Sequence, residues 1–300
     1  MPRRKAEIDG QEHFFPAADF ETGAPLRLKP PSERLWTRNK AQLIAKYLRE
    51  FVYVTRHGTY VDVFAGRQSD QVDASWSVEE VIDKQLDSFH LRHYWLFEKD
   101  PTKVAALEAL RDAHPELDVV VNPPCDSNRA VPAALPVGQL GEKEATFCLI
   151  DQRTTECEWS TVRHLASMKP GRYKPELFYF LAQGWFNRAL KSRTTDDALA
   201  ATDRWWGNEQ WRSLLELSAM ERAEVMASRF REELGYKTAV PWPIYDREGG
   251  STVMFHMIHA TDHDRAPRLM NSAYEWAVKP KALPNENQLE MLLGDITYEP

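Results

Sequence analysis

The sequence predicts an α/β protein built on a seven-stranded, mostly parallel sheet that ends in an antiparallel hairpin. Strand-like apolar runs alternate with helical patterns between residues 59 and 182. Several of these runs are almost continuously apolar, which indicates strands that are covered on both faces, as in a parallel sheet. Two further strand-like runs near the C-terminus flank the turn-rich stretch "DREGG". Together these observations predict a Rossmann-like sheet wrapped by helices.

The composition suits one large domain, because the chain has 300 residues and 43% of them are hydrophobic. No window approaches about 18 consecutive apolar residues, the length that spans a membrane. The charged N-terminus also lacks the apolar region of a secretory signal. The formal net charge of -7 argues against a strong free-standing nucleic-acid binder. The sparse cysteines show no C-x-x-C spacing, which argues against a disulfide framework or a zinc knuckle. We therefore expect a cytoplasmic protein with no membrane segment.

The chain is expected to begin with an extended arm, residues 1–32, which is rich in proline and charge and has no periodicity. A single domain then covers residues 33–300. Its first helix is predicted by an apolar stripe with one- and four-residue steps, with Ser32 as a candidate cap. The stripe consists of Leu43, Ile44, Tyr47, Leu48, Phe51 and Val52.

Five strands follow, and helical patterns separate them. The predicted strands are "TYVDVFAG" (59–66), "HYWLFEKD" (93–100), "LDVVVN" (117–122), "EATFCLID" (144–151) and "PELFYFLA" (175–182). Helices are predicted over 101–114 and 158–168, whereas residues 67–91 form a longer excursion after the first strand.

The C-terminal part predicts a helical insertion followed by the hairpin. Residues 194–234 are predicted to be helical throughout, with Thr195 suited to the N-terminus. The hairpin strands are "KTAVPWPIY" (237–245) and "STVMFHMIHAT" (251–261), and a last helix covers about 266–278. Five parallel strands and a terminal hairpin are typical of class I methyltransferases, in which the seventh strand is antiparallel. A plain dinucleotide-binding fold lacks that hairpin.

Ligands of open parallel sheets bind at the carboxyl ends of the strands. The first predicted strand ends with Asp62, Phe64, Ala65 and Gly66. A glycine there lets backbone N–H groups approach a charged ligand closely. Asp62 lies within an apolar strand and needs a partner when buried. That partner is either a ligand ammonium or backbone N–H groups of the same turn, and in the second case the aspartate is structural.

The next two strand ends also carry acids. Glu98 follows the second strand, where an acid accepts the ribose hydroxyls of a nucleotide. The third strand leads to "CDSN", in which Asp126 and Asn128 either bind an adenine amino group or form an Asx-turn. Because Asp62, Glu98 and Asp126 recur at three successive strand ends, the sequence predicts a nucleoside site.

Asp151 ends the fourth strand, close to where a substrate would meet a nucleoside cofactor. Its carboxylate could orient or deprotonate a nucleophile, or it could cap the following turn. His256 and His259 fall on opposite faces of a strand, because the side-chain period is two, so a metal site is not expected. The tryptophans of the insertion suit either core packing or an acceptor wall. They are Trp205, Trp206 and Trp211.

A set of segments, taken in order, resembles the three-Cys-motif partner proteins, known as TcmP. They are "LWTRNKAQLIAKYL", "YVDVFAG", "LFEKD", "CDSN", "FCLIDQRTTECEWSTVRHLA", "FNRAL" and "MFHMIHATDH", and they cover roughly residues 35 to 275. The resemblance implies a class I methyltransferase fold that uses S-adenosylmethionine. The family is named for bacterial genes beside a three-cysteine, radical-SAM-like protein, which is therefore the implied partner.

The resemblance also implies roles for residues at matching positions. Asp151 matches the aspartate of the family's fourth-strand "D-P" and would position the methyl acceptor. The "D-x-F-x-G" turn, the second-strand acid and the "D-x-N" motif are also matched, and with the neighbouring Ala65 they give a cofactor-binding set. This set is Asp62, Phe64, Ala65, Gly66, Glu98, Asp126 and Asn128.

Two departures from the family pattern accompany these matches. The family continues its glycine turn as "G-P-G", whereas this chain has Gly66-Arg67-Gln68. Its fourth-strand aspartate usually precedes proline, whereas here Gln152 and Arg153 follow. The leading hypothesis is an S-adenosylmethionine-dependent methyltransferase with an unknown acceptor, for which a nucleic acid is one candidate. The alternative is a non-catalytic partner or scaffold for the radical-SAM-like protein. A magnesium nuclease would need more tightly clustered carboxylates than the sequence offers.

Overall fold

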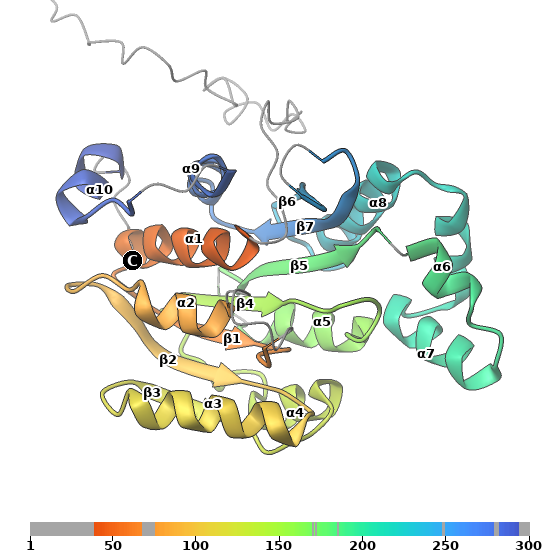
Figure 1. The fold of residues 1–300 in the computed structure, drawn as a ribbon, viewed down its shortest axis with the longest axis horizontal. Helices are drawn as coiled ribbons and strands as arrows, with labels where there is room; N and C mark the ends of the chain where they lie inside the picture. Colours follow the sequence, from red (N-terminus) through yellow and green to blue (C-terminus); the bar gives the residue numbers. More distant parts are fainter. Residues whose placement is uncertain are drawn as a thin grey trace, which may run out of the picture. The chain divides into compact units, whose positions relative to one another are not determined.

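A seven-stranded sheet lies at the centre of the protein, in the order β3-β2-β1-β4-β5-β7-β6 (Figure 1). The strands are β1 (His57–Asp62), β2 (His90–Leu96), β3 (Asp118–Val121), β4 (Thr146–Ile150), β5 (Glu176–Ala182), β6 (Thr238–Tyr245) and β7 (Val253–Thr261). The first five pair in parallel. Strand β7 is antiparallel to both β5 and β6. The predicted Rossmann-like α/β sheet with an antiparallel terminal hairpin is therefore confirmed.

The computed structural model describes residues 39–67, 76–169, 171, 173–184, 186–247, 250–278 and 282–293. The predicted arm and Ser32 lie outside the described residues. The helices are α1 (Lys40–Thr55), α2 (Ser77–Asp83), α3 (Pro101–Ala113), α4 (Ser127–Ala134), α5 (Trp159–Ser167), α6 (Phe186–Lys191), α7 (Asp196–Trp206), α8 (Ala219–Glu232), α9 (Ala266–Val278) and α10 (Glu286–Leu293), with a 3-10 helix at Glu209–Glu216. None of the described helices is long and apolar enough to cross a membrane.

Helix α1 confirms the predicted apolar stripe, because all six of its members are buried. Tyr47 packs on two aromatic residues of the sheet, with ring centroids 5.8 Å from Phe147 and 4.8 Å from Phe178. Tyr47, Glu176 and His259 are joined by buried hydrogen bonds on the same side of the sheet. Helix α9 packs against α1 and extends this layer (Figure 1).

The opposite side of the sheet is covered by α4, α5, α7 and α8. The strand side chains that face these helices, such as Val61, Ile150 and Tyr179, form one buried cluster with the aromatic residues of the helices. Because both faces are buried, the strands read as continuous apolar runs. The Arg229 guanidinium of α8 lies between the indoles of Trp159 and Trp206, 3.8 and 4.1 Å from their ring centroids. This contact connects α8 with α5 and α7.

Several predicted elements require correction. Strand β1 ends at Asp62 and not at Gly66, because the chain turns there and the Phe64 N–H donates to the Asp62 carboxylate. Residues 194–234 are not helical throughout. Helix α7 ends before Gly207, whose φ of 90° is left-handed, and α8 begins after a new cap at Ser218. Short helices α2, α4, α6 and α10 are additional, since six to eight residues give too few turns for a periodic pattern.

Candidate functional site

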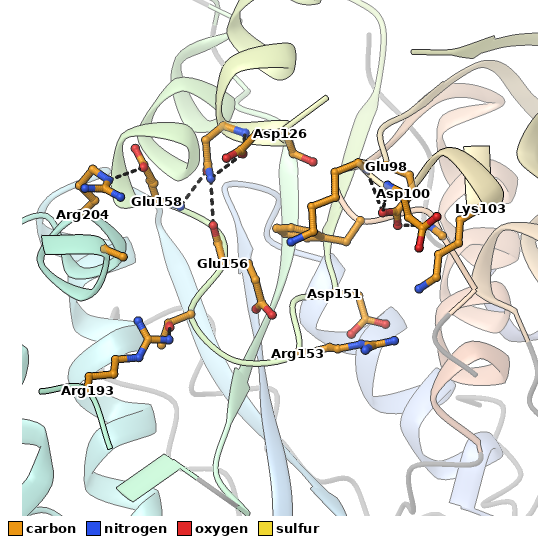
Figure 2. Close-up of a pocket in the computed structure, with 17 residues that line it drawn as sticks. Glu98, Asp100, Lys103, Asp126, Asp151, Arg153, Glu156, Glu158, Arg193 and Arg204 are labelled. Carbon is orange, nitrogen blue, oxygen red and sulfur yellow. Dashed lines mark hydrogen bonds and ion pairs between the residues drawn. The ribbon is translucent and has the colours of Figure 1, made fainter. Parts of the chain in front are cut away.

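A cleft of about 460 Å³ opens at the carboxyl ends of the parallel strands (Figure 2). The chain order reverses between β1 and β4, and such a reversal is where open α/β sheets bind their ligands. The volume lies within the range of about 300–1,000 Å³ that holds small molecules. Six of the eight predicted site residues line this cleft: Phe64, Gly66, Glu98, Asp126, Asn128 and Asp151.

Gly66 and Glu98 meet at one end of the cleft. The Gly66 N–H donates to Glu98 Oε2 (3.1 Å), and the N–H groups of Lys99 and Asp100 donate to Oε1 (2.8 and 2.9 Å). A Cβ at position 66 would lie 2.1 Å from Glu98 Oε2, so only glycine allows this contact. A carboxylate offers about four lone-pair sites. These three bonds leave Glu98 room for one more donor.

The turn that carries Gly66 is held by the start of α2. The buried Trp76 indole N–H donates to the Ala65 carbonyl (2.7 Å). The Arg67 guanidinium stacks on the Trp76 ring, 5.2 Å from its centroid, and pairs with Glu79. Arg67 therefore packs toward α2 and is not among the residues that line the cleft.

Two of the predicted cofactor-binding residues do not line the cleft. Asp62 is 1% exposed, and its carboxylate accepts hydrogen bonds from the Tyr60 hydroxyl (2.8 Å) and the Phe64 N–H (3.0 Å). The Ala65 N–H donates to the Phe97 carbonyl (2.9 Å). Asp62 and Ala65 instead fix the turn next to the cleft. For Asp62, the structural role that the sequence left open is the one observed.

Asp126 and Asn128 line the cleft and also organise the backbone. Asp126 caps α4, and its Oδ1 accepts from the Asn128 N–H (2.9 Å), which is the hydrogen bond of an Asx-turn. The Asn128 amide reaches across to the loop after β4. It donates to the Glu156 carbonyl and accepts from the Glu158 N–H, each at 2.9 Å. These bonds fix the position of the loop that forms the other side of the cleft.

Asp151 lies between the two sides of the cleft (Figure 2). Lys40, the first residue of α1, places its ammonium 2.7 Å from both carboxylate oxygens of Asp151. The same ammonium lies 4.9 Å from the ring centroid of Phe180 and 5.1 Å from that of Phe255. The sequence did not identify Lys40, because 111 residues separate it from Asp151.

The side opposite Glu98 carries arginines that the sequence did not single out for this site. Figure 2 shows Arg193 and Arg204 there, across the cleft from Glu98 and Lys103. Arg204 pairs with Glu158 (2.7 Å). Arg193 donates hydrogen bonds to the hydroxyls of Thr155 and Thr202. One signal was present, since "NRALKSR" (187–193) is a basic run that ends at this residue.

The tryptophans of the insertion are core residues, not a stacking surface. Trp205, Trp206 and Trp211 are at most 5% exposed. Trp205 donates its indole N–H to the Tyr179 hydroxyl (2.9 Å). The β7 histidines lie on opposite faces as predicted, with His256 near Gln183 and His259 near Tyr47. Within the described residues, no cluster of three His, Cys, Asp or Glu side chains has the geometry of a metal site.

Comparison with known proteins gives no independent assignment. Neither a scan against protein-family models nor a search of curated proteins found a match to this chain.

Proposed function

We propose that the protein is a class I methyltransferase that uses S-adenosylmethionine and is related to the TcmP proteins. One observation carries this proposal: the sheet has the order β3-β2-β1-β4-β5-β7-β6 with an antiparallel β7, and its cleft gathers Gly66, Glu98 and Asp126. The hairpin distinguishes this arrangement from a plain dinucleotide-binding sheet. The close approach of the Gly66 backbone to an acid supports a nucleoside ligand.

The residues of the cleft fit such a cofactor, although Glu98 has room for only one further hydrogen bond. The remaining lone pair of Glu98 can accept one ribose hydroxyl, and the fingerprint acid of dinucleotide sites acts in the same way. Asp126 uses Oδ1 for its cap, which leaves Oδ2 for an adenine amino group. The backbone at Gly66 would approach the methionine part. The cofactor supplies an activated methyl group on a sulfonium.

Asp151 would orient the acceptor. Both of its oxygens contact the Lys40 ammonium, so its position is fixed before a ligand binds. In-line displacement at a sulfonium depends mainly on alignment of the reacting groups. We therefore assign Asp151 a positioning role next to the acceptor, and Lys40 the role of holding Asp151 in place.

A scaffold function is the second candidate, and a specific observation favours it. Every acid expected to contact the nucleoside already accepts backbone hydrogen bonds: Asp62 from one N–H, Glu98 from three and Asp126 from one. Such acids maintain the fold without any ligand. In that case the chain would serve as a non-catalytic partner of a three-cysteine, radical-SAM-like protein.

Titration calorimetry with S-adenosylmethionine separates the two candidates. Under the methyltransferase proposal the wild type binds, and Glu98→Ala weakens binding by about 10- to 100-fold, the loss expected for a charged hydrogen bond. Glu108→Ala is the matched control, because Glu108 is exposed on α3 and does not line the cleft. Asp151→Asn should bind the cofactor almost normally. No binding by the folded wild type would support the scaffold function.

A further inference from the structure

Arg193 stands out among the cations of the cleft because hydroxyls, not carboxylates, hold it. Its Nη1 donates to Thr202 Oγ1 (2.8 Å) and its Nη2 donates to Thr155 Oγ1 (2.5 Å). Thr202 belongs to α7 and is fully buried, and Thr155 belongs to the loop after β4 and is 8% exposed. Two elements therefore fix the orientation of one guanidinium that lines the cleft.

Arg193 forms no direct ion pair with a carboxylate in the part of the chain that the structure describes. In contrast, Arg204 pairs with Glu158, and Lys40 with Asp151. Burial lowers the pKa of Arg193, an effect that the nearby charge of Glu156 partly opposes. A guanidinium has five N–H donors, and its hydrogen bonds to the described residues use two of them.

A purely structural role does not account for this arrangement well. Neutral hydroxyls can anchor a side chain, but they do not neutralise its partly buried positive charge, which the nearby Glu156 offsets only in part. An anion at the remaining donors would form charge-assisted hydrogen bonds, which are stronger than neutral ones. The position of Arg193 also suits a ligand contact. Arg193 lines the same cleft as Asp151, on the side formed by the loop that follows β4 (Figure 2).

We propose that Arg193 binds an anionic group, a carboxylate or a phosphate, on the molecule that enters this side of the cleft. As a statement about the methyl acceptor, this rests on the proposed function. As a statement about anion binding, it does not depend on S-adenosylmethionine. A phosphate would come from a nucleotide or nucleic acid, and a carboxylate from a small organic acid or an acidic side chain.

The test follows the arginine side-chain NMR signals of the full chain, without cofactor, during titration with sodium phosphate or sodium acetate at constant ionic strength. We expect a saturable shift of the Arg193 Nε–H signal with at least one anion. Arg193→Met, followed through the neighbouring backbone signals, should weaken binding about tenfold or more. Arg188→Met is the matched control, because Arg188 is an exposed arginine of α6 that does not line the cleft.

The outcomes are separable. A response to acetate alone identifies a carboxylate ligand, and a response to phosphate alone identifies a phosphate ligand. An Arg193 Nε–H shift that is absent or does not saturate overturns the proposal, and so does an unchanged anion affinity of Arg193→Met in the backbone signals. Should Arg193→Met unfold, Thr155→Val keeps the guanidinium but removes one of its anchors, and an unchanged anion affinity there also overturns it. Anion binding without cofactor binding would leave Arg193 as an anion site and refute only the methyltransferase.

Discussion

Four acids of the cleft, two on each side, are held in place by different means. On the side formed by β1, β2 and β3, the carboxylates of Glu98 and Asp126 accept hydrogen bonds from backbone N–H groups. On the side formed by β4, α5 and α7, the carboxylates of Asp151 and Glu158 pair with side chains 111 and 46 residues away. Backbone donors are supplied by the turn itself, whereas a side-chain pair requires a second residue that the fold must deliver. The buried pair of the second side should therefore be the most sensitive to substitution, and its exposed pair the least sensitive.

The largest expected effect comes from Lys40→Met, which removes the ammonium that contacts both oxygens of the buried Asp151 carboxylate. The two side chains are only 10% and 6% exposed, so the loss of unfolding free energy should be about 3 kcal/mol. Urea denaturation measures it. In Lys40→Met/Asp151→Asn most of that loss should disappear. Lys84→Met removes a more exposed pair with Glu80 and should cost about 0.5 kcal/mol. Equal losses of unfolding free energy for the two lysine variants would contradict the greater sensitivity expected of the buried pair.

An intermediate effect is expected for the pH dependence of stability at Asp62. Burial raises its pKa to about 7 despite hydrogen bonds from Tyr60 and Phe64. An unfolded aspartate has a pKa of about 3.9. Between these values the native state keeps a proton that the unfolded state loses. This contribution to stability is therefore complete below about pH 4 and is lost as pH rises through 7.

Asp62→Asn removes that dependence. Relative to the wild type, the variant should gain about 2 kcal/mol of unfolding free energy between pH 5 and pH 8, measured by urea denaturation at both values. His256 acts in the opposite direction, because burial lowers its pKa to about 4. Its contribution is lost as pH falls from about 6.5 through 4, and it cancels when wild type and variant are compared. A pH-independent difference would show that Asp62 is ionised throughout.

The smallest expected effects on stability compare an acid held by backbone N–H groups, Asp126, with an exposed ion pair, Glu158–Arg204. Asp126→Ala removes the cap of α4 and should cost about 1 kcal/mol of unfolding free energy. Glu158→Gln weakens the exposed pair with Arg204 and should cost about 0.5 kcal/mol or less. Thermal denaturation of the two variants gives this order. A larger loss for Glu158→Gln would mean that this side-chain pair is more important than its exposure indicates.

The same contrast explains what could be predicted from the sequence. The strands were recognisable because burial on both faces gives apolar runs, and the acids that follow them, Glu98 and Asp126, were recognisable by position alone. Lys40 and Arg193 were not, because their partners Asp151 and Thr155 are distant in the chain. For Asp62 the sequence left two partners open, and the turn directly after it supplies one of them, the Phe64 N–H, together with the Tyr60 hydroxyl.

Arg229, held between the indoles of Trp159 and Trp206, has a consequence for ligand entry. Each cation–π contact of a desolvated guanidinium contributes about 0.5–2 kcal/mol, so separating α5, α7 and α8 from one another would break two of them at once. These helices should move as one rigid body. The width of the cleft on this side would then be set before any ligand arrives, and little conformational entropy would be lost on binding. Selection among ligands would depend on fit to a preformed shape, and association would not wait for a slow closure.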